Sequence, residues 1–352
     1  MRVVAFVACL AVLSAVLRPE LSLAQPSGTS ESRSAPRAKG QHARTQPVAT
    51  TTVPIKRVKP EPVPVLPVYS VSQLGDHLHA VRWELAVVGA AIATVGIKDW
   101  DWGNGSGFQT IEEGWFAKNT RHGGMDKIGH SFSTFVIADL LTDRIQANAT
   151  NPAGAPITAS LVAFGIMGLA ETLDGFTGRH RFSREDIVAN GVGALFSAVR
   201  NSIPGLREKL DWRIMYTPAS FERPGITGEN GILPPYERQR YIMALKGSGF
   251  ETLKNTPLRY LELHAGFDAR GFEDKERKRG YPIERSFYAG LGLNLNEVLF
   301  GTGPFPNFRR QKDTLPGWAV RKTFEYVQVP YTSVYSENRF STVRLVNTTF
   351  DD

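Results

Sequence analysis

The chain has 352 residues, of which 42% are hydrophobic and 21% charged, and this ordinary composition excludes wholesale disorder and a collagen-like structure. Cys9 is the single cysteine, so a disulfide framework and a multi-cysteine metal site are excluded as well. The net charge of +7 comes mainly from residues 25–69, which hold seven Lys and Arg against two Glu. Because the rest of the chain is close to neutral, we expect no nucleic-acid partner.

The N-terminal segment predicts export from the cytoplasm. A positively charged start precedes an apolar run from Val3 to Leu17, and Ser22 and Ala24 supply the small residues before a cleavage point. This pattern is typical of a signal peptide over residues 1–24, because the run is shorter than the roughly 20 residues that span a membrane. We therefore expect a periplasmic, membrane-associated protein, with the inner and the outer membrane both left open.

A linker is predicted at residues 25–69. This segment is rich in Pro, Ser, Thr and Ala and ends in a proline-dense stretch from Pro60 to Pro67, which is typical of a disordered or semi-rigid spacer. On an exported protein, a flexible basic arm fits membrane lipid or a cell-wall polymer as its partner. A solvated tether with no partner is the alternative interpretation.

Residues 70–212 predict a helical domain. Apolar residues occupy most faces of its segments, which favours contact with a membrane or burial in one, whereas a compact soluble bundle is the alternative. The four predicted helices are Ala80–Ile97, Ile128–Ile145, Ile157–Leu173 and Ile187–Val199.

Ionisable and polar residues interrupt these helices near their ends. A charge in an apolar helix is costly unless it is paired, so we expect these side chains to converge. A buried structural network, a polar-ligand site and a hydrolytic site all fit. The hydrolytic interpretation makes His130, Glu171 and Asp186 catalytic and allows a divalent metal at Asp126, His130 and Glu171. The full set is Asp126, Lys127, His130, Glu171, Asp174, Ser183, Asp186 and Asn190.

Four blocks of the sequence resemble a known family. Their order resembles that of the YfiM-type family of predicted periplasmic proteins or lipoproteins, which have a domain of unknown function. The blocks are Glu113–Phe116, Gly123–His130, Glu171–Gly175 and Phe182–Gly193. The same order is more distantly similar to the VanZ-like group of small four-helix membrane proteins. The resemblance covers about Trp83–Asn201. It implies an envelope location and a helical bundle, and it implies no reaction.

Residues 213–352 predict a small antiparallel β region. Leu258–Arg270 alternates apolar and polar residues, which is typical of a half-buried strand, and Phe287–Leu295 repeats the pattern after a charged loop. Lys322–Val329 is a third predicted strand, and a short helical stretch is predicted over residues 234–246. We expect this region to pack on the helices or to bind a protein partner.

The predicted fold is therefore α+β, with a four-helix, membrane-associated bundle followed by a small antiparallel β region. The predicted function is a non-enzymatic module of the cell envelope that binds or scaffolds lipid or wall components, because no catalytic motif of specific spacing is present. A hydrolase acting on a lipid-linked or phosphorylated envelope substrate is one alternative. An accessory to envelope transport or assembly is the other.

Overall fold

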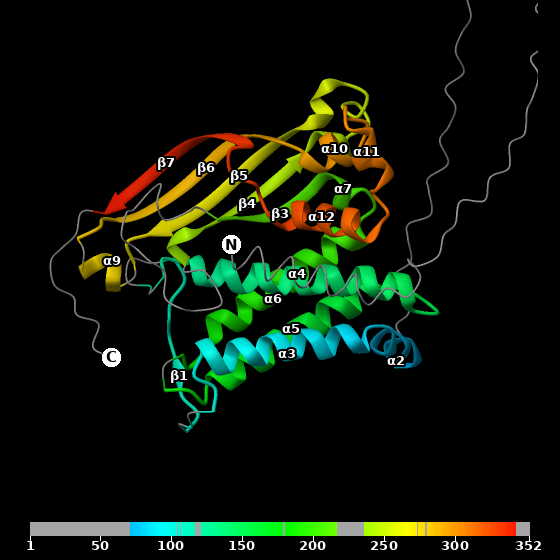
Figure 1. The fold of residues 1–352 in the computed structure, drawn as a ribbon. Coiled ribbons are helices and arrows are strands. Elements are labelled where there is room, and N and C mark those ends of the chain that lie inside the picture. The colour runs from blue at the N-terminus through cyan, green and yellow to red at the C-terminus, as the bar shows by residue number, and fades with distance from the viewer. Residues whose placement is uncertain are drawn as a thin grey trace, which may run out of the picture.

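The computed structural model describes residues 71–216 and 236–342, apart from 104, 106, 117–119, 121, 179, 273 and 279. The predicted signal peptide (1–24) and linker (25–69) lie outside the described residues. Packed helices are followed by a five-stranded antiparallel sheet (Figure 1), which confirms the α+β prediction.

Helices occupy all four segments that were predicted to be helical. In Figure 1 the longest of them, α4, lies between the sheet and the lower helices, and most of its residues are buried. Close approach of α4 and α6 depends on Gly193, because a Cβ there would lie 1.9 Å from the backbone oxygen of Ser131. The helices are α2 (Val71–Ala80), α3 (Arg82–Asp99), α4 (Met125–Asn148), α5 (Ala155–Asp174) and α6 (Arg184–Ser202).

The sheet has the order β3-β4-β5-β6-β7, and every neighbouring pair is antiparallel. Two of its strands, β5 and β6, confirm the two strands predicted on either side of the charged loop, and they pair with each other. A separate two-stranded parallel sheet pairs β1 (Thr110–Ile111) with β2 (Phe182–Ser183). Helices connect or flank the five-stranded sheet: α7 (Leu206–Lys209), α9 (Asp274–Lys278), α10 (Leu295–Phe300), α11 (Pro306–Arg310) and α12 (Leu315–Tyr326). The strands are β3 (Leu210–Tyr216), β4 (Gln239–Lys246), β5 (Leu261–Arg270), β6 (Ile283–Leu293) and β7 (Ser333–Thr342).

Two local predictions in the C-terminal region are wrong. The strand predicted at Lys322–Val329 lies mostly in α12, which begins after Thr314, whose hydroxyl accepts a hydrogen bond from the backbone N–H of Gly317. A run of eight residues is too short for its pattern to distinguish a strand from a helix, and the threonine cap begins a helix here. The helical stretch predicted at residues 234–246 is a single 3₁₀ turn followed by strand β4.

Helices and sheet share one hydrophobic core. The indole of Trp212 in β3 is surrounded by the rings of Phe132, Phe135 and Phe196 from α4 and α6, with ring centroids 5.3–5.8 Å apart. Burial of these rings ties the sheet to the helices, since each large side chain contributes roughly 1.5–3 kcal/mol.

The alternation predicted in β5 is present, but in the first half of the strand the buried side is the polar one. Glu262 and His264 are 1% and 4% exposed, whereas Leu263 between them is 59% exposed. Glu262 accepts two hydrogen bonds from the guanidinium of Arg213, and His264 bonds the hydroxyl of Tyr335. A periodic pattern assigns residues to the two faces of a strand and leaves open which face is covered.

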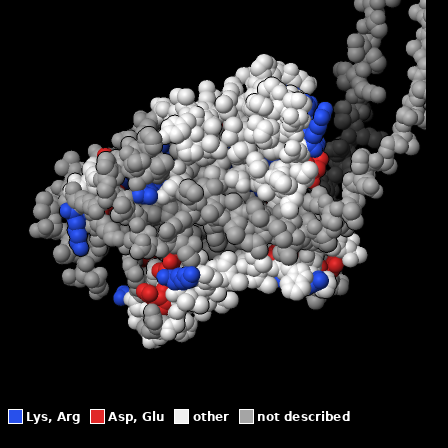
Figure 2. Space-filling view, viewed as in Figure 1, with Lys and Arg blue, Asp and Glu red and all other residues white. Residues whose placement is uncertain are grey.

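Charged side chains on the visible surface gather toward the two ends of the molecule (Figure 2). The helices in Figure 1 run between these ends, and the described surface between them is largely uncharged.

Candidate functional site

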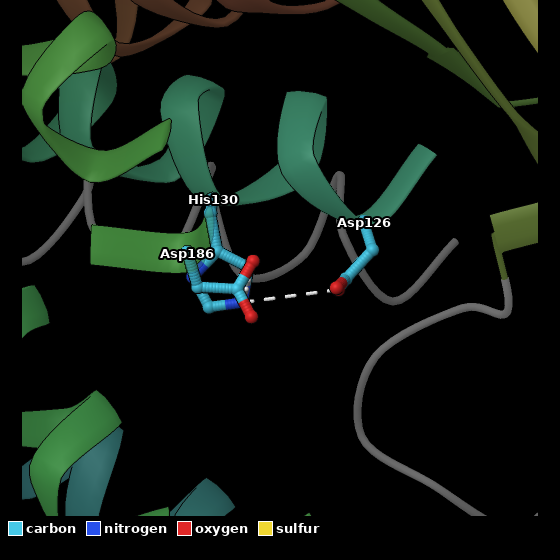
Figure 3. Close-up of side chains that lie close together, drawn as sticks. All are labelled: Asp126, His130 and Asp186. Carbon is cyan, nitrogen blue, oxygen red and sulfur yellow. Dashed lines mark ion pairs between the residues drawn. The ribbon is translucent and has the colours of Figure 1, made fainter. Parts of the chain in front are cut away.

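The candidate site lies where the first turn of α4 meets the first turn of α6 (Figure 3). Gly123 and Gly124 have φ of 64° and 94°, a left-handed conformation that favours glycine and turns the chain into α4. Ser183 caps α6 by accepting a hydrogen bond from the backbone N–H of Asp186. Asp126 and His130 share one face of α4 because they are four residues apart.

Three side chains converge at this meeting point. His130 Nε2 lies 3.7 Å from Asp126 Oδ1 and 3.8 Å from Asp186 Oδ1, and one ligand atom from each residue lies within 4.8 Å of the other two. These separations are too long for direct hydrogen bonds. They fit ligand atoms that each lie about 2.0–2.2 Å from one shared metal ion.

Lys127 fixes the two carboxylates from the protein side. Its ammonium is buried and donates to Asp126 Oδ2 at 2.9 Å and to Asp186 Oδ1 at 2.7 Å, and it also pairs with Glu113. Burial alone opposes its positive charge, but the three carboxylates outweigh that effect and raise the pKa of Lys127. Tyr236 adds a hydrogen bond from its hydroxyl to Asp126 Oδ1 at 2.6 Å.

His130 is the member of the group with the most open side chain, at 20% exposure. Its Nδ1 atom is buried and has no hydrogen-bond partner among the residues that the structure describes. Burial lowers the pKa of His130, but the carboxylates of Asp186 and Asp126 outweigh it, so the pKa is raised overall. The imidazole thus presents Nε2 to two anionic oxygens.

Further carboxyl groups border the site with their pKa values raised toward neutrality. Burial, with the nearby charge of Asp186, raises the pKa of Glu171 to about 8, and Glu171 accepts a hydrogen bond from the backbone N–H of Ser183. Burial raises the pKa of Asp174 to about 6, although the indole N–H of Trp102 hydrogen-bonds its carboxylate. Burial and Asp126 raise the pKa of Glu113 to about 7.

The predicted site residues fall into three groups. Asp126, Lys127, His130 and Asp186 meet directly, and Glu171 and Asp174 lie at the border. Ser183 caps α6, and the buried side-chain oxygen of Asn190 accepts a hydrogen bond from the Thr134 hydroxyl, which joins α6 to α4. In the three-residue cluster that is able to hold a metal, Asp186 takes the place expected for Glu171.

Sequence reasoning missed two partners of the site, Glu113 and Tyr236. Glu113 precedes α4 by twelve residues and stands in a block that carries the family resemblance, which was the available signal. Tyr236 follows the helices by more than thirty residues and reaches Asp126 through the tertiary fold alone, so the sequence held no signal for it.

Comparison with known proteins gives one match. The family model DUF2279, described as a predicted periplasmic lipoprotein, matches residues 112–202. No curated protein and no solved structure matches the chain. The matched stretch contains α4, α5 and α6 and all eight predicted site residues. Over residues 112–202 the chain is therefore similar to a family of predicted periplasmic lipoproteins whose domain has no known function, as the sequence resemblance implied.

Proposed function

We propose that this chain is an envelope protein whose helical region binds a divalent cation through Asp126, His130 and Asp186. The observation that supports this is the convergence of one imidazole nitrogen and two carboxylate oxygens, from two helices, at separations that suit a shared ion. One nitrogen and two oxygen donors fit Zn²⁺ or Mn²⁺.

The charge around the cluster favours a cation. One ammonium, that of Lys127, pairs with three carboxylates, and two further carboxyl groups border the site. A bound cation relieves the repulsion that contributes to the raised pKa values of the bordering groups. Lys127 and Tyr236 hold the carboxylates in place, as outer partners of metal ligands commonly do. The five carboxyl groups are those of Glu113, Asp126, Glu171, Asp174 and Asp186.

The role we propose for the cation is binding rather than catalysis. Three protein ligands leave coordination positions open, and the partial exposure of Asp126 and His130 gives access to them. An anionic oxygen of an envelope component, such as a phosphate group, fits these positions. The protein would then hold lipid-linked or wall-linked anions.

Hydrolysis of such a component is a second candidate function, and a different observation favours it. Glu171 and Asp174, with pKa values of about 8 and 6, exchange protons near neutral pH, as general acids and bases do. Both border the group that contains His130.

Cation binding is tested by titrating Mn²⁺ and Zn²⁺ into the purified chain from residue 25 onward by isothermal calorimetry. We expect one site that His130→Ala and Asp186→Asn each weaken at least about ten-fold. His79→Ala is the matched control, since that histidine lies on α2 and contacts Arg82. Absence of binding at millimolar metal, or equal binding by folded His130→Ala protein, would refute the proposal.

The two functions are separated by Glu171→Gln. This variant keeps the acceptor for the Ser183 N–H and all three proposed ligands, so cation binding should persist. If the loaded wild type cleaves chromogenic phosphate mono- and diesters and the variant does not, the hydrolase candidate is supported. If neither cleaves while both bind the cation, the binding role stands.

A further inference from the structure

The polarity of α6 is inverted relative to a helix on a water-exposed surface. One stripe of this helix is apolar and 41–64% exposed. Its residues are spaced by four, three and four positions: Val188, Val192, Leu195 and Val199. The polar residues of the same helix turn inward: Asp186, Asn190, Ser197 and Arg200 are at most 4% exposed. A helix at a water-facing surface does the opposite.

Helix α5 repeats this inversion. Leu161, Leu169 and Leu173 are exposed, whereas Thr158 and Ser160 are buried. With 20 and 19 residues, α5 and α6 are each about 30 Å long, close to the thickness of the hydrocarbon core of a bilayer. By length and composition α5 qualifies as a membrane span in the part of the chain that the structure describes, as does the bent pair α2–α3 taken as one span.

The sheet carries a matching apolar row. Leu245, Leu263, Leu291 and Val334 are direct neighbours across β4, β5, β6 and β7, and they are 37%, 59%, 53% and 79% exposed. Leu210 of β3 begins the row. Beside this row, the opposite face of the sheet holds buried polar side chains such as Glu262 and His264, so the polarity along the row is inverted in the same sense as that of the helices.

The α6 stripe and the sheet row border the same part of the core. Leu210 and Trp212 are two residues apart in β3 and therefore lie on one face of the sheet. Trp212 contacts Phe196, which lies next to Leu195 of the stripe, with ring centroids 5.3 Å apart. In Figure 1, α6 crosses behind α4 and leads through α7 into β3.

We propose that this apolar belt, formed by the α5 and α6 stripes and the sheet row, contacts the acyl chains of a lipid bilayer. Turning polar groups inward on helices and strands alike suits lipid, where an outward polar group has no water to bond. The charged side chains near the two ends of the molecule in Figure 2 fit the polar layers on either side of such a core. This inference goes beyond the cation site and does not depend on it.

The test is flotation of the chain from residue 25 onward with vesicles of phosphatidylcholine alone, at about 0.5 M NaCl. Uncharged lipid and high salt suppress attraction by the basic segment 25–69, because screening is then effective within a few ångströms. We expect the wild type to float and the double variant Leu195→Asp/Leu263→Asp to partition at least about ten-fold less. Phe308→Asp on α11, where the side chain is 45% exposed outside the belt, is the control and should float.

A labelling experiment covers the case in which the aspartate variants fail to fold. The chain after Cys9 has no cysteine, so Leu195→Cys and Leu263→Cys each accept one environment-sensitive dye. Blue-shifted emission on adding vesicles is expected at both positions and not at Phe308→Cys. Unshifted emission at both positions would overturn the proposal. A lipid-free dimer in ultracentrifugation that Leu263→Asp dissociates would also overturn it, and would assign the belt to a second copy of the chain.

Discussion

Replacing Asp139 by asparagine should unfold the junction between helices and sheet. Asp139 of α4 is fully buried and accepts hydrogen bonds from Arg200 at 2.8 Å and Arg207 at 3.2 Å, and from the hydroxyl of Tyr326 in α12. Arg200 also donates to Asp211 of β3, so a single carboxylate links α4, α6, α12 and, through Arg200, the sheet.

The expected loss is large because the cations stay behind. Removing one partner of a buried ion pair costs about 3–5 kcal/mol, and here it leaves the buried cations around Asp139 with one carboxylate fewer to neutralise them. Asp143→Asn is the matched control: it lies one helical turn away and pairs with Arg207 and Lys322, but its side chain is 15% exposed. The control should lose less than Asp139→Asn, because water reaches part of its carboxylate.

The assay is urea unfolding followed by tryptophan fluorescence, because Trp212 reports the shared core. Burial opposes the charge of Asp139, but Arg207, Arg200 and Lys322 outweigh it and hold its pKa far below the usual value. The stabilisation is therefore complete above about pH 4 and is lost as the pH falls below it. A folded Asp139→Asn protein within 1 kcal/mol of wild type, with unchanged acid sensitivity, would refute this account.

Two more predictions concern α6 and the site. Gly193→Ala should lower the free energy of unfolding by about 1–3 kcal/mol, because the added Cβ meets the Ser131 backbone oxygen. Gly191→Ala is the control: its Cβ would lie 3.8 Å from the nearest atom, so the variant should be neutral or slightly stabilised. Thermal melts compare the two variants. In the metal-free folded chain the pKa of Glu171 is about 8, whereas in the unfolded chain it is about 4.5. The free energy of unfolding should therefore decrease as the pH rises from about 4.5 to about 8. Urea unfolding across that range should show a smaller fall for Glu171→Gln; an identical fall would contradict the assignment.

Local spacing predicted the part of the site that lies on one helix. Asp126, Lys127 and His130 stand within five residues, and their shared face follows from helical geometry. That Asp186 meets them depends on how α6 crosses α4, which Gly193 permits and no local pattern encodes. The sheet was less accessible: β3, β4 and β7 were missed.

The inverted strand explains which sequence rule fails and why. Alternation in β5 shows which residues share a face, and the expectation that the apolar face is buried assumes that water lies outside. The same assumption fails for α5 and α6: the helical repeat shows which of their residues share a face, but the apolar stripe on each helix is exposed. One cause accounts for all three elements if the surroundings of the belt are apolar. The buried ion pairs around Asp139 fit this view, because charges turned away from lipid must be neutralised inside the protein.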